Sequence, residues 1–251
     1  MYVPKRKVSI TVALPASTTT DIPHLREKTF RLGFIGRTLA IFRVDKLLIY
    51  RDKPQKQDFK LMEKILSYMT TPQYLRKKVF GITPELKYVG TLPPLRTPNH
   101  PLKKISKELR KGDIRKGLVI KSSEKFSLVD IGVEKPVKVE GYFKPKTLIN
   151  VEICEVGKEF KAKPVGLEEI SSYWGFKVEA VNQTLDEVAE RKEFDLKIAT
   201  SRYGQQLQEV MDVLIKKWIN SKRVLIAFGS PTEGIEEILA EKNLKPSDVF
   251  D

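Results

Sequence analysis

The sequence has few of the residues that build disulfide frameworks or metal centres. Its 251 residues include one cysteine, Cys154, and two histidines, His24 and His100. A single cysteine excludes an internal disulfide and every zinc site that needs two or four cysteines, and with two histidines we expect no metal site. Because structural disulfides belong to oxidising compartments, we expect a cytoplasmic location.

A long hydrophobic run and the common catalytic signatures are also missing. The N-terminal stretch MYVPKRKVSITVALPAS places basic residues before apolar ones, but Ser9 and Thr11 interrupt it and it is too short to span a bilayer. We interpret it as a first strand and expect no membrane partner. The patterns GxSxG, HExxH, GxxxxGK and GxGxxG do not occur, which argues against the enzymes and nucleotide-binding folds that they mark.

Positive charge dominates the composition. There are 46 Lys and Arg residues against 32 Asp and Glu, so the formal net charge is +14. A field of this sign attracts polyanions and holds them in a salt-dependent way. Nucleic acid is therefore the expected partner class. An anionic membrane surface is the competing class, but no basic amphipathic segment or lipidation motif stands out.

Hydrophobic patterning at both ends of the sequence alternates between strands and helices, as in an α/β fold. The expected strands cover residues 7–14, 44–50, 175–181, 196–200 and 224–228. The expected helices cover residues 22–42, 56–69, 72–80, 184–191, 205–219 and 235–241. Strands that are separated by helices usually pair in parallel, so we expect a parallel sheet.

The middle of the sequence differs from both ends in composition and in hydrophobic pattern. The segment TLPPLRTPNHP carries four prolines and precedes short alternating segments such as GLVIKSSEKFSLVDIG. These segments predict a small five-stranded, OB-like barrel. We expect it as an inserted all-β domain at 91–165, within a discontinuous α/β domain at 1–90 and 166–251. Residues 91–165 carry 17 Lys and Arg against 9 Asp and Glu, a net charge of +8, so more than half of the excess positive charge lies in the expected barrel, which is where we expect a polyanion to bind.

Three turns follow expected strands and contain small or hydroxyl residues. They are LPAS at 14–17, ATSRYG at 199–204 and FGSPTEG at 228–234. The carboxyl ends of parallel strands are where α/β sheets bind ligands, so we expect the three turns to converge on a purine or ribose. The alternative is that Thr200 and Ser201 only cap the helix that begins at Gln205.

The segment IGRTLAIFRVDKLLIY, residues 35–50, resembles the first helix and second strand of the SPOUT superfamily of S-adenosylmethionine-dependent methyltransferases. ATSRYG and FGSPTEG resemble its cofactor loops. More narrowly, VALPAS, YVGTLPPLRTPNHPL and the inserted barrel resemble the archaeal and eukaryotic RNA methyltransferase branch, related to the spindle-associated SPOUT protein of animals. The resemblance covers almost the whole chain. It implies an α/β-knot, the SPOUT trefoil, with a parallel sheet and an inserted OB-like barrel.

The resemblance also implies roles for individual residues. The S-adenosylmethionine pocket would be lined by Thr200, Ser201, Gly204, Phe228, Gly229, Ser230 and Gly234. Arg37 matches the catalytic arginine beside the methyl group and the acceptor nucleotide, where a guanidinium can neutralise a phosphate or hold a base oxygen, and Arg202 is the second candidate. The alternative for Arg37 is a salt bridge on the helix surface.

The family resemblance implies a homodimer, because the active site of this family is usually built between two subunits. Family members continue past the equivalents of Val249 and Phe250 with a strand, a third cofactor loop and a helix that complete the knot. The sequence ends at Asp251, which leaves two alternatives: residues 1–251 belong to a longer chain that carries this segment, or the cofactor pocket lacks one of its walls and methyl transfer is not expected.

The resulting functional hypothesis is S-adenosylmethionine-dependent methylation of RNA, either ribosomal or transfer RNA. The barrel residues expected to hold RNA are Lys103, Lys104, Lys107, Arg110, Lys121, Lys125, Phe126, Tyr142 and Lys144. One alternative is a non-catalytic RNA-binding protein on the same scaffold, with Phe126, Tyr142 and Phe143 as stacking platforms, unless those rings belong to the core. Protein methylation is the other alternative.

Overall fold

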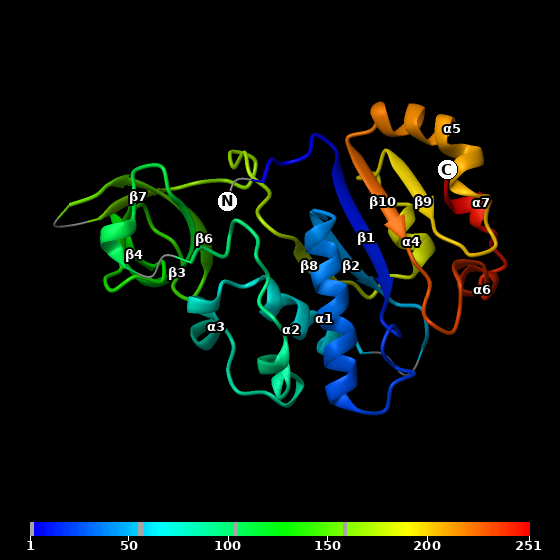
Figure 1. Cartoon of the computed structure of the whole chain (residues 1–251), viewed down its shortest axis with the longest axis horizontal. Coiled ribbons are helices and arrows are strands. Elements are labelled where there is room, and N and C mark those ends of the chain that lie inside the picture. The colour runs from blue at the N-terminus through cyan, green and yellow to red at the C-terminus, as the bar shows by residue number, and fades with distance from the viewer. Residues whose placement is uncertain (1–2, 55–57, 103–104, 158–159) are drawn as a thin grey trace. The chain divides into compact units, whose positions relative to one another are not determined.

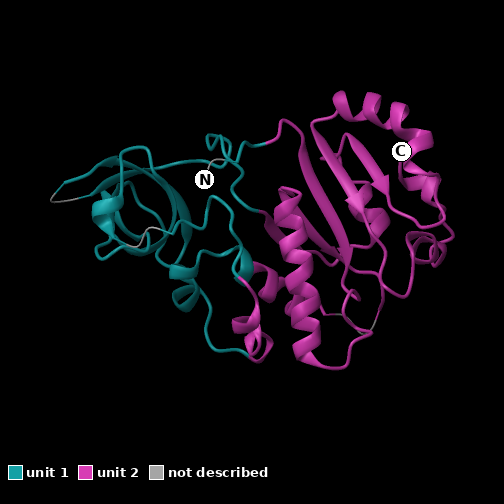
Figure 2. Cartoon of the chain, in the orientation of Figure 1, with its two compact units in different colours: residues 1–5, 68–83, 94–175 teal, residues 6–67, 84–93, 176–251 magenta. Residues whose placement is uncertain are grey.

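The chain forms two compact units in the computed structural model, which describes residues 3–54, 58–102, 105–157 and 160–251. The sheet unit comprises residues 6–67, 84–93 and 176–251, and the barrel unit comprises residues 1–5, 68–83 and 94–175 (Figure 2). Each unit has a hydrophobic core cluster of its own.

The sheet unit is built on five parallel strands in the order β8-β2-β1-β10-β9 (Figure 1). The strands are β1 (Ser9–Pro15), β2 (Lys46–Tyr50), β8 (Lys177–Ala180), β9 (Leu196–Ala199) and β10 (Arg223–Ala227). The helices are α1 (Leu25–Ile41), most of α2 (Phe59–Thr70), α4 (Leu185–Ala189), α5 (Leu207–Ile219), α6 (Ile235–Ala240), α7 (Pro246–Val249), and the short η1 (Pro84–Leu86) and η2 (Val89–Thr91). The predicted parallel sheet and the order of its elements are confirmed.

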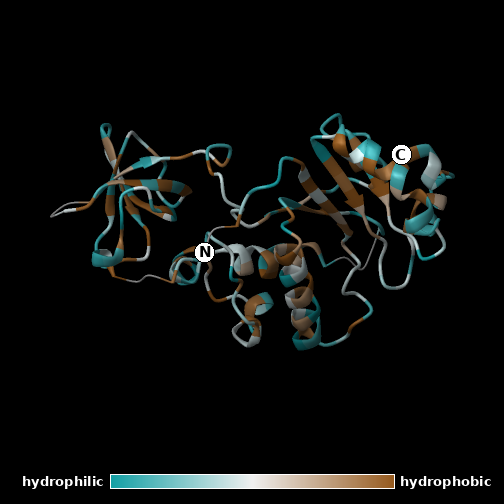
Figure 3. Ribbon diagram, turned by 45° about the horizontal axis from the view of Figure 1, so that its top comes forward, coloured by the Kyte–Doolittle hydropathy of each residue, from teal (hydrophilic) through white to brown (hydrophobic). Residues whose placement is uncertain are grey.

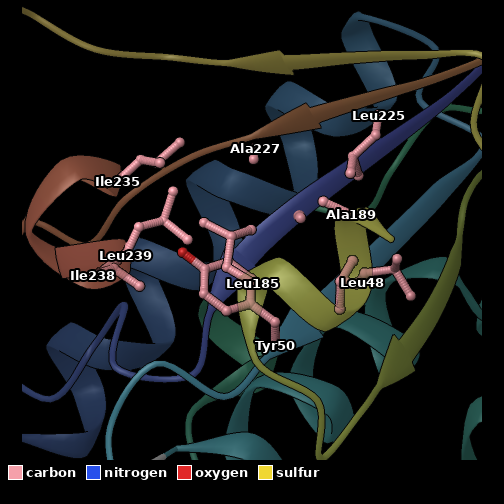
Figure 4. Close-up of a cluster of buried hydrophobic side chains, with 11 residues drawn as sticks. Leu48, Tyr50, Leu185, Ala189, Leu225, Ala227, Ile235, Ile238 and Leu239 are labelled. Atoms are coloured by element: carbon pink, nitrogen blue, oxygen red, sulfur yellow. The ribbon is translucent and has the colours of Figure 1, made fainter. Parts of the chain in front are cut away.

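One face of the sheet is covered by α4 and α6. Leu48 and Ala227 point to this face from β2 and β10 and pack with Leu185 and Leu239 from the two helices (Figure 4). Ala13 of β1 belongs to the same buried cluster. Figure 3 shows the central strands as predominantly hydrophobic. Continuous apolar strands of this kind need cover on both faces.

The opposite face of the sheet is covered only in part. Residues that alternate with Ala13 on β1, namely Ile10, Val12 and Leu14, line an apolar groove of about 710 Å³ together with residues of α1 and β10. Phe34 on α1 and Phe42, which directly follows the helix, remain 71% and 62% exposed. This groove is therefore a large hydrophobic surface that the sheet unit leaves open to solvent.

The barrel unit contains a closed five-stranded barrel, as the sequence predicts. Its strands pair in the order β3-β4-β5-β7-β6, and β6 returns to β3. The strands are β3 (Ile114–Ser122), β4 (Phe126–Asp130), β5 (Val137–Glu140), β6 (Leu148–Glu155) and β7 (Lys161–Pro164), accompanied by α3 (Gln73–Val79) and η3 (Ser106–Glu108). All pairs are antiparallel except β5 with β7. Alternating valines and isoleucines fill the interior.

The barrel strands all lie between β2 and β8 in the sequence, and these two strands pair directly in the sheet. The unit boundaries nevertheless differ from those expected from composition, because residues 68–83 cluster with the barrel. Tyr74 donates a hydrogen bond of 2.6 Å to the carbonyl oxygen of Lys116, and Lys78 forms an ion pair with Asp130. The amino-acid composition of a helical segment does not reveal that the segment packs against a barrel.

Two kinds of feature are absent from the described residues. No helix among them combines the length and the hydropathy that a bilayer-spanning segment needs. Within the same ranges, no group of three or more His, Cys, Asp and Glu side chains is placed so that it could hold a metal ion.

Candidate active site

The turns that follow β9 and β10 line one cavity of about 300 Å³ in the sheet unit. β9 and β10 are parallel neighbours, so both turns leave the sheet at the same edge. Of the residues expected in a cofactor pocket, those in the cavity lining are Thr200, Ser201, Gly229, Ser230 and Gly234, and Arg202 lies there as well. Two turns that are far apart in the sequence therefore share one cavity, at the edge of the sheet where α/β folds bind ligands.

The first turn is tied to the end of β10 through Thr200. Its backbone amide and its hydroxyl both donate to the carbonyl oxygen of Ala227, at 3.0 and 2.9 Å. Ser201 accepts a bond of 3.0 Å from the amide of Tyr203. The next helix begins at Leu207, and its N-cap residue Gln206 makes no capping bond. Thr200 thus joins the first turn to the end of β10, Ser201 bonds within its own turn, and the capping alternative is wrong.

The second turn is closed by Ser230 and Glu233. The amide of Ser230 donates to the carbonyl oxygen of Glu233 at 2.7 Å, and the amide of Glu233 donates to the hydroxyl of Ser230 at 2.9 Å. A Cβ atom at Gly229 would lie 2.5 Å from the carbonyl oxygen of Glu233 and 2.8 Å from Cα of Gly234. Only glycine fits here, because the obstructing atoms belong to the backbone.

The third expected turn, at the end of β1, does not line the cavity. Ala16 and Ser17 are 0% and 3% exposed. The amide of Ala16 donates to the carbonyl oxygen of Tyr50, and both the amide and hydroxyl of Ser17 donate to the carboxylate of Asp52. The expectation that three turns converge is therefore wrong for LPAS, whose polar groups are used to bind the end of β2.

Two expected cofactor residues, Phe228 and Gly204, lie outside the cavity lining. Phe228 lines the apolar groove on the α1 face, and its carbonyl oxygen accepts a hydrogen bond of 2.9 Å from the buried hydroxyl of Tyr50. Gly204 is an exposed member of the β9 turn.

The cavity lining is more acidic than the chain as a whole. Glu233, Glu236 and Glu237 line it together with a single cation, Arg202, whose guanidinium carbon lies 4.8 Å from the ring centre of Tyr203. The sequence-based prediction did not include these glutamates. Glu236 and Glu237 lie in the first turn of α6, where acidic residues are common for reasons unrelated to a ligand. Carboxylates at this position favour a cationic or hydroxyl-bearing ligand and disfavour a phosphate.

Arg37 is exposed on α1, next to residues that line the apolar groove. No ion pair of its guanidinium is found among the residues that the structure describes, so the alternative of a helix-surface salt bridge has no support there. Arg37 does not line the cavity that contains Arg202. The two expected catalytic arginines are therefore not brought together in one cavity of this chain.

Most of the expected RNA-binding residues gather where β3, β4 and β5 begin or end. The amide of Gly141 donates to the carbonyl oxygen of Lys125, which brings the loop after β5 beside the β3–β4 turn. The residues of this cluster are Lys121, Lys125, Phe126, Tyr142 and Lys144, and all except the half-buried Phe126 are exposed. Phe143 packs against the barrel core instead.

The aromatic members of this cluster have different surroundings. Tyr142 is 63% exposed, whereas the ring of Phe126 is covered by Lys138, whose Nζ lies 4.3 Å from the ring centre. Lys107 and Arg110 are exposed before the first residue of β3, at the opposite end of that strand. Lys103 and Lys104 lie outside the described residues.

Comparison with known proteins gives a consistent result. A family model described as "Putative RNA methyltransferase" matches residues 9–251. An uncharacterised protein of Haloarcula marismortui is 30% identical over 92% of this chain and 82% of its own length. The human protein named 28S rRNA (uridine-N(3))-methyltransferase is 27% identical over 98% of this chain and 71% of its own. A Caenorhabditis elegans protein named "Putative methyltransferase spot-1" is 28% identical, with coverage of 97% and 72%.

Proposed function

The chain belongs to this RNA methyltransferase family, and from that premise we propose that it methylates ribosomal RNA at a uridine, with S-adenosylmethionine as the methyl donor. The observation that carries the proposal is the cavity that the β9 and β10 turns share at the carboxyl edge of the parallel sheet. We propose the uridine N3 position because the human, mouse and fly relatives are named 28S rRNA (uridine-N(3))-methyltransferase.

The residues of the cavity suit an adenosyl ligand. Hydroxyls of Ser201 and Thr232 and the backbone around Gly229 offer hydrogen-bonding groups for a nucleoside, and Gly229 lets a ligand approach the main chain. Glu236 and Glu237 provide acceptors for ribose hydroxyls and favour a positively charged ligand. S-adenosylmethionine, when bound, supplies a methyl group activated by a sulfonium.

Arg37 is the proposed catalytic residue. A uridine gives up its N3 proton when N3 is methylated, so the charge that develops on the uracil ring needs a nearby cation. A guanidinium that donates two hydrogen bonds to a uracil oxygen or a neighbouring phosphate stabilises that charge and fixes the base. The unpaired state of Arg37 in the described residues leaves its donors available for this role.

We further propose that the protein is a homodimer with a SPOUT α/β-knot sheet unit. The apolar groove beside α1 supports this proposal, because it leaves Phe34 exposed on the same helix as Arg37 and Phe42 exposed directly after that helix. Pairing through this face buries those side chains and lets Arg37 of one protomer reach the cavity of its partner. Because a C2 interface is self-complementary, both sites would be completed together.

The barrel unit is proposed to be an OB-like RNA-binding domain. Its pairing order, with a single parallel contact between β5 and β7, supports that assignment. Exposed lysines beside Tyr142 combine charge with a stacking surface, as single-strand binders do. The net charge of +14 supports a polyanionic substrate.

The proposal is tested by label transfer. The protein is incubated with methyl-labelled S-adenosylmethionine and, in parallel, with ribosomal RNA, transfer RNA and a protein extract, and digested RNA is analysed for 3-methyluridine. Label in ribosomal RNA supports the proposal. Label in transfer RNA or protein would reassign the substrate, and salt-dependent RNA binding without any transfer would favour a non-catalytic RNA-binding protein.

A further inference from the structure

The residues that follow β2 make direct bonds to both ends of the turn at 228–234. The buried hydroxyl of Tyr50 donates to the carbonyl oxygen of Phe228 at 2.9 Å. The ammonium of Lys53 donates to the carboxylate of Glu233 at 2.6 Å. Phe228 begins the turn and Glu233 is its sixth residue, so the two contacts span nearly all of it.

The end of β2 is itself held in place. Asp52 is 7% exposed, and it accepts hydrogen bonds from the amide of Ser17, at 3.1 Å, and from the hydroxyl of the same residue. Tyr50, Asp52 and Lys53 therefore connect the buried β1 turn to the β10 turn. Ser17, the polar residue of LPAS, does not line the cavity but is linked to the 228–234 turn through this chain of contacts.

Glu233 also fixes the inside of the turn. Its amide and carbonyl bond to Ser230 while its side chain is held by Lys53. The side chains of Lys53 and Glu233 are 29% and 32% exposed, so the ion pair is partly shielded from water. Burial raises the pKa of Tyr50 well above its ordinary value, which keeps its hydroxyl protonated as a donor.

We propose that Tyr50 and Lys53 are positioning residues, which hold the 228–234 turn in the shape that binds the cofactor without contacting the cofactor themselves. Neither residue lines the cavity, whereas Glu233, Ser230 and Gly229 do. The inference rests on the proposed function for the identity of the ligand. The shape of the turn can be measured without any ligand.

The test uses the full chain with Lys53→Met, Lys53→Arg and Tyr50→Phe. The matched control is Lys46→Met, at the other end of β2, because Lys46 also forms partly exposed ion pairs, with Glu179 and Glu193 at 3.2 and 3.4 Å. Two quantities are measured: the dissociation constant for S-adenosylhomocysteine by calorimetry, and hydrogen exchange of the turn amides in the free protein.

Lys53→Met and Tyr50→Phe are expected to weaken S-adenosylhomocysteine binding about fivefold each and to speed exchange at Ser230 and Glu233. Lys53→Arg restores both, and Lys46→Met changes neither. Unaltered exchange and unaltered affinity in Lys53→Met and Tyr50→Phe would overturn the positioning role. Wild-type protein that binds no S-adenosylhomocysteine would instead overturn the proposed function, while the exchange measurement still decides whether the two residues hold the turn.

Discussion

Thr200 and Ala227 join the two turns of the candidate site: the hydroxyl and the amide of Thr200 both donate to the carbonyl oxygen of Ala227, at 2.9 and 3.0 Å. This contact sets the spacing of two segments that are remote in the sequence. If the spacing defines the cavity, the site depends on a hydroxyl at position 200.

Thr200→Val keeps the shape of the side chain and the amide bond but removes the hydroxyl bond. We expect a loss of about 1 kcal/mol in the free energy of unfolding and weaker binding of S-adenosylhomocysteine. Calorimetric titration and urea unfolding measure the two effects. Thr200→Ser, which retains the hydroxyl, serves as the control. Equal affinity in the valine variant and the wild type would show that this bond does not shape the cavity.

Gly229→Ala tests the close packing of the second turn. The added Cβ would meet the backbone of Glu233 and Gly234 at 2.5 and 2.8 Å, so the turn has to move. We expect a stability cost of about 1–3 kcal/mol and loss of cofactor binding. Gly90→Ala is the matched control, because nothing lies within 4 Å of a Cβ at that position. A Gly229→Ala variant that binds as well as Gly90→Ala contradicts the account.

Much of this arrangement was predictable from the sequence, for identifiable reasons. After their first residues, β1, β2 and β10 are mostly apolar and almost entirely buried, so their hydrophobic runs predicted strands directly. The turns after β9 and β10 were found because parallel neighbours end at one edge of a sheet.

Other features of the site depend on contacts between residues far apart in the sequence, which no local sequence pattern predicts. Lys53 and Glu233 are separated by 180 residues, and nothing around either residue marks the other as its partner. The LPAS turn was expected at the cavity because its residue types suit a ligand, yet Ser17 binds Asp52 instead. A small polar side chain can form its hydrogen bonds with a buried polar group of the protein as readily as with a ligand.

Arg37 is expected to act in methyl transfer and not in folding. Since its guanidinium is exposed and has no ion-pair partner among the described residues, Arg37→Ala should leave the unfolding free energy within about 0.5 kcal/mol of wild type. Transfer of label to RNA should fall by at least about tenfold, while S-adenosylhomocysteine affinity is retained.

The proposed dimer gives this variant a further test. Mixing Arg37→Ala subunits with Gly229→Ala subunits creates heterodimers in which one of the two sites has both intact halves. Recovery of activity on mixing is expected. If neither variant gains activity on mixing, Arg37 does not act across a subunit interface.

Lowering the pH should reduce the free energy of unfolding of the barrel unit, because His100 takes up a proton more readily in the unfolded chain. Burial lowers the pKa of this imidazole to about 4, with Arg76 and Lys116 acting in the same direction. Between pH 6.5 and 4 the unfolded chain binds a proton that the folded chain does not, so stability is full above pH 6.5 and falls with pH, by about 3 kcal/mol at most.

Urea unfolding at pH 7 and pH 5 measures this effect. Trp174 reports on the barrel unit once Trp218 is replaced by phenylalanine, since the chain has two tryptophans. In that background His100→Gln should flatten the pH dependence between 6.5 and 4. An unchanged pH dependence in His100→Gln would assign the acid sensitivity to other groups.

The lysines beside Tyr142 should set the salt dependence of RNA binding. Replacing Lys121, Lys125 and Lys144 with glutamine is expected to reduce the slope of log affinity against log salt by about 0.7 for each phosphate that is no longer neutralised. Lys192→Gln, an exposed change in the sheet unit, is the control. A slope equal to that of the control would remove this cluster from the RNA-binding surface.

The most direct test of the account is a crystal structure of the protein with S-adenosylhomocysteine. The account predicts density for the adenosyl group in the cavity between residues 200–203 and 229–237, against Gly229 and Ser201. Density at any other place on the chain, or a cavity that stays empty when the protein is saturated with the ligand, would contradict it.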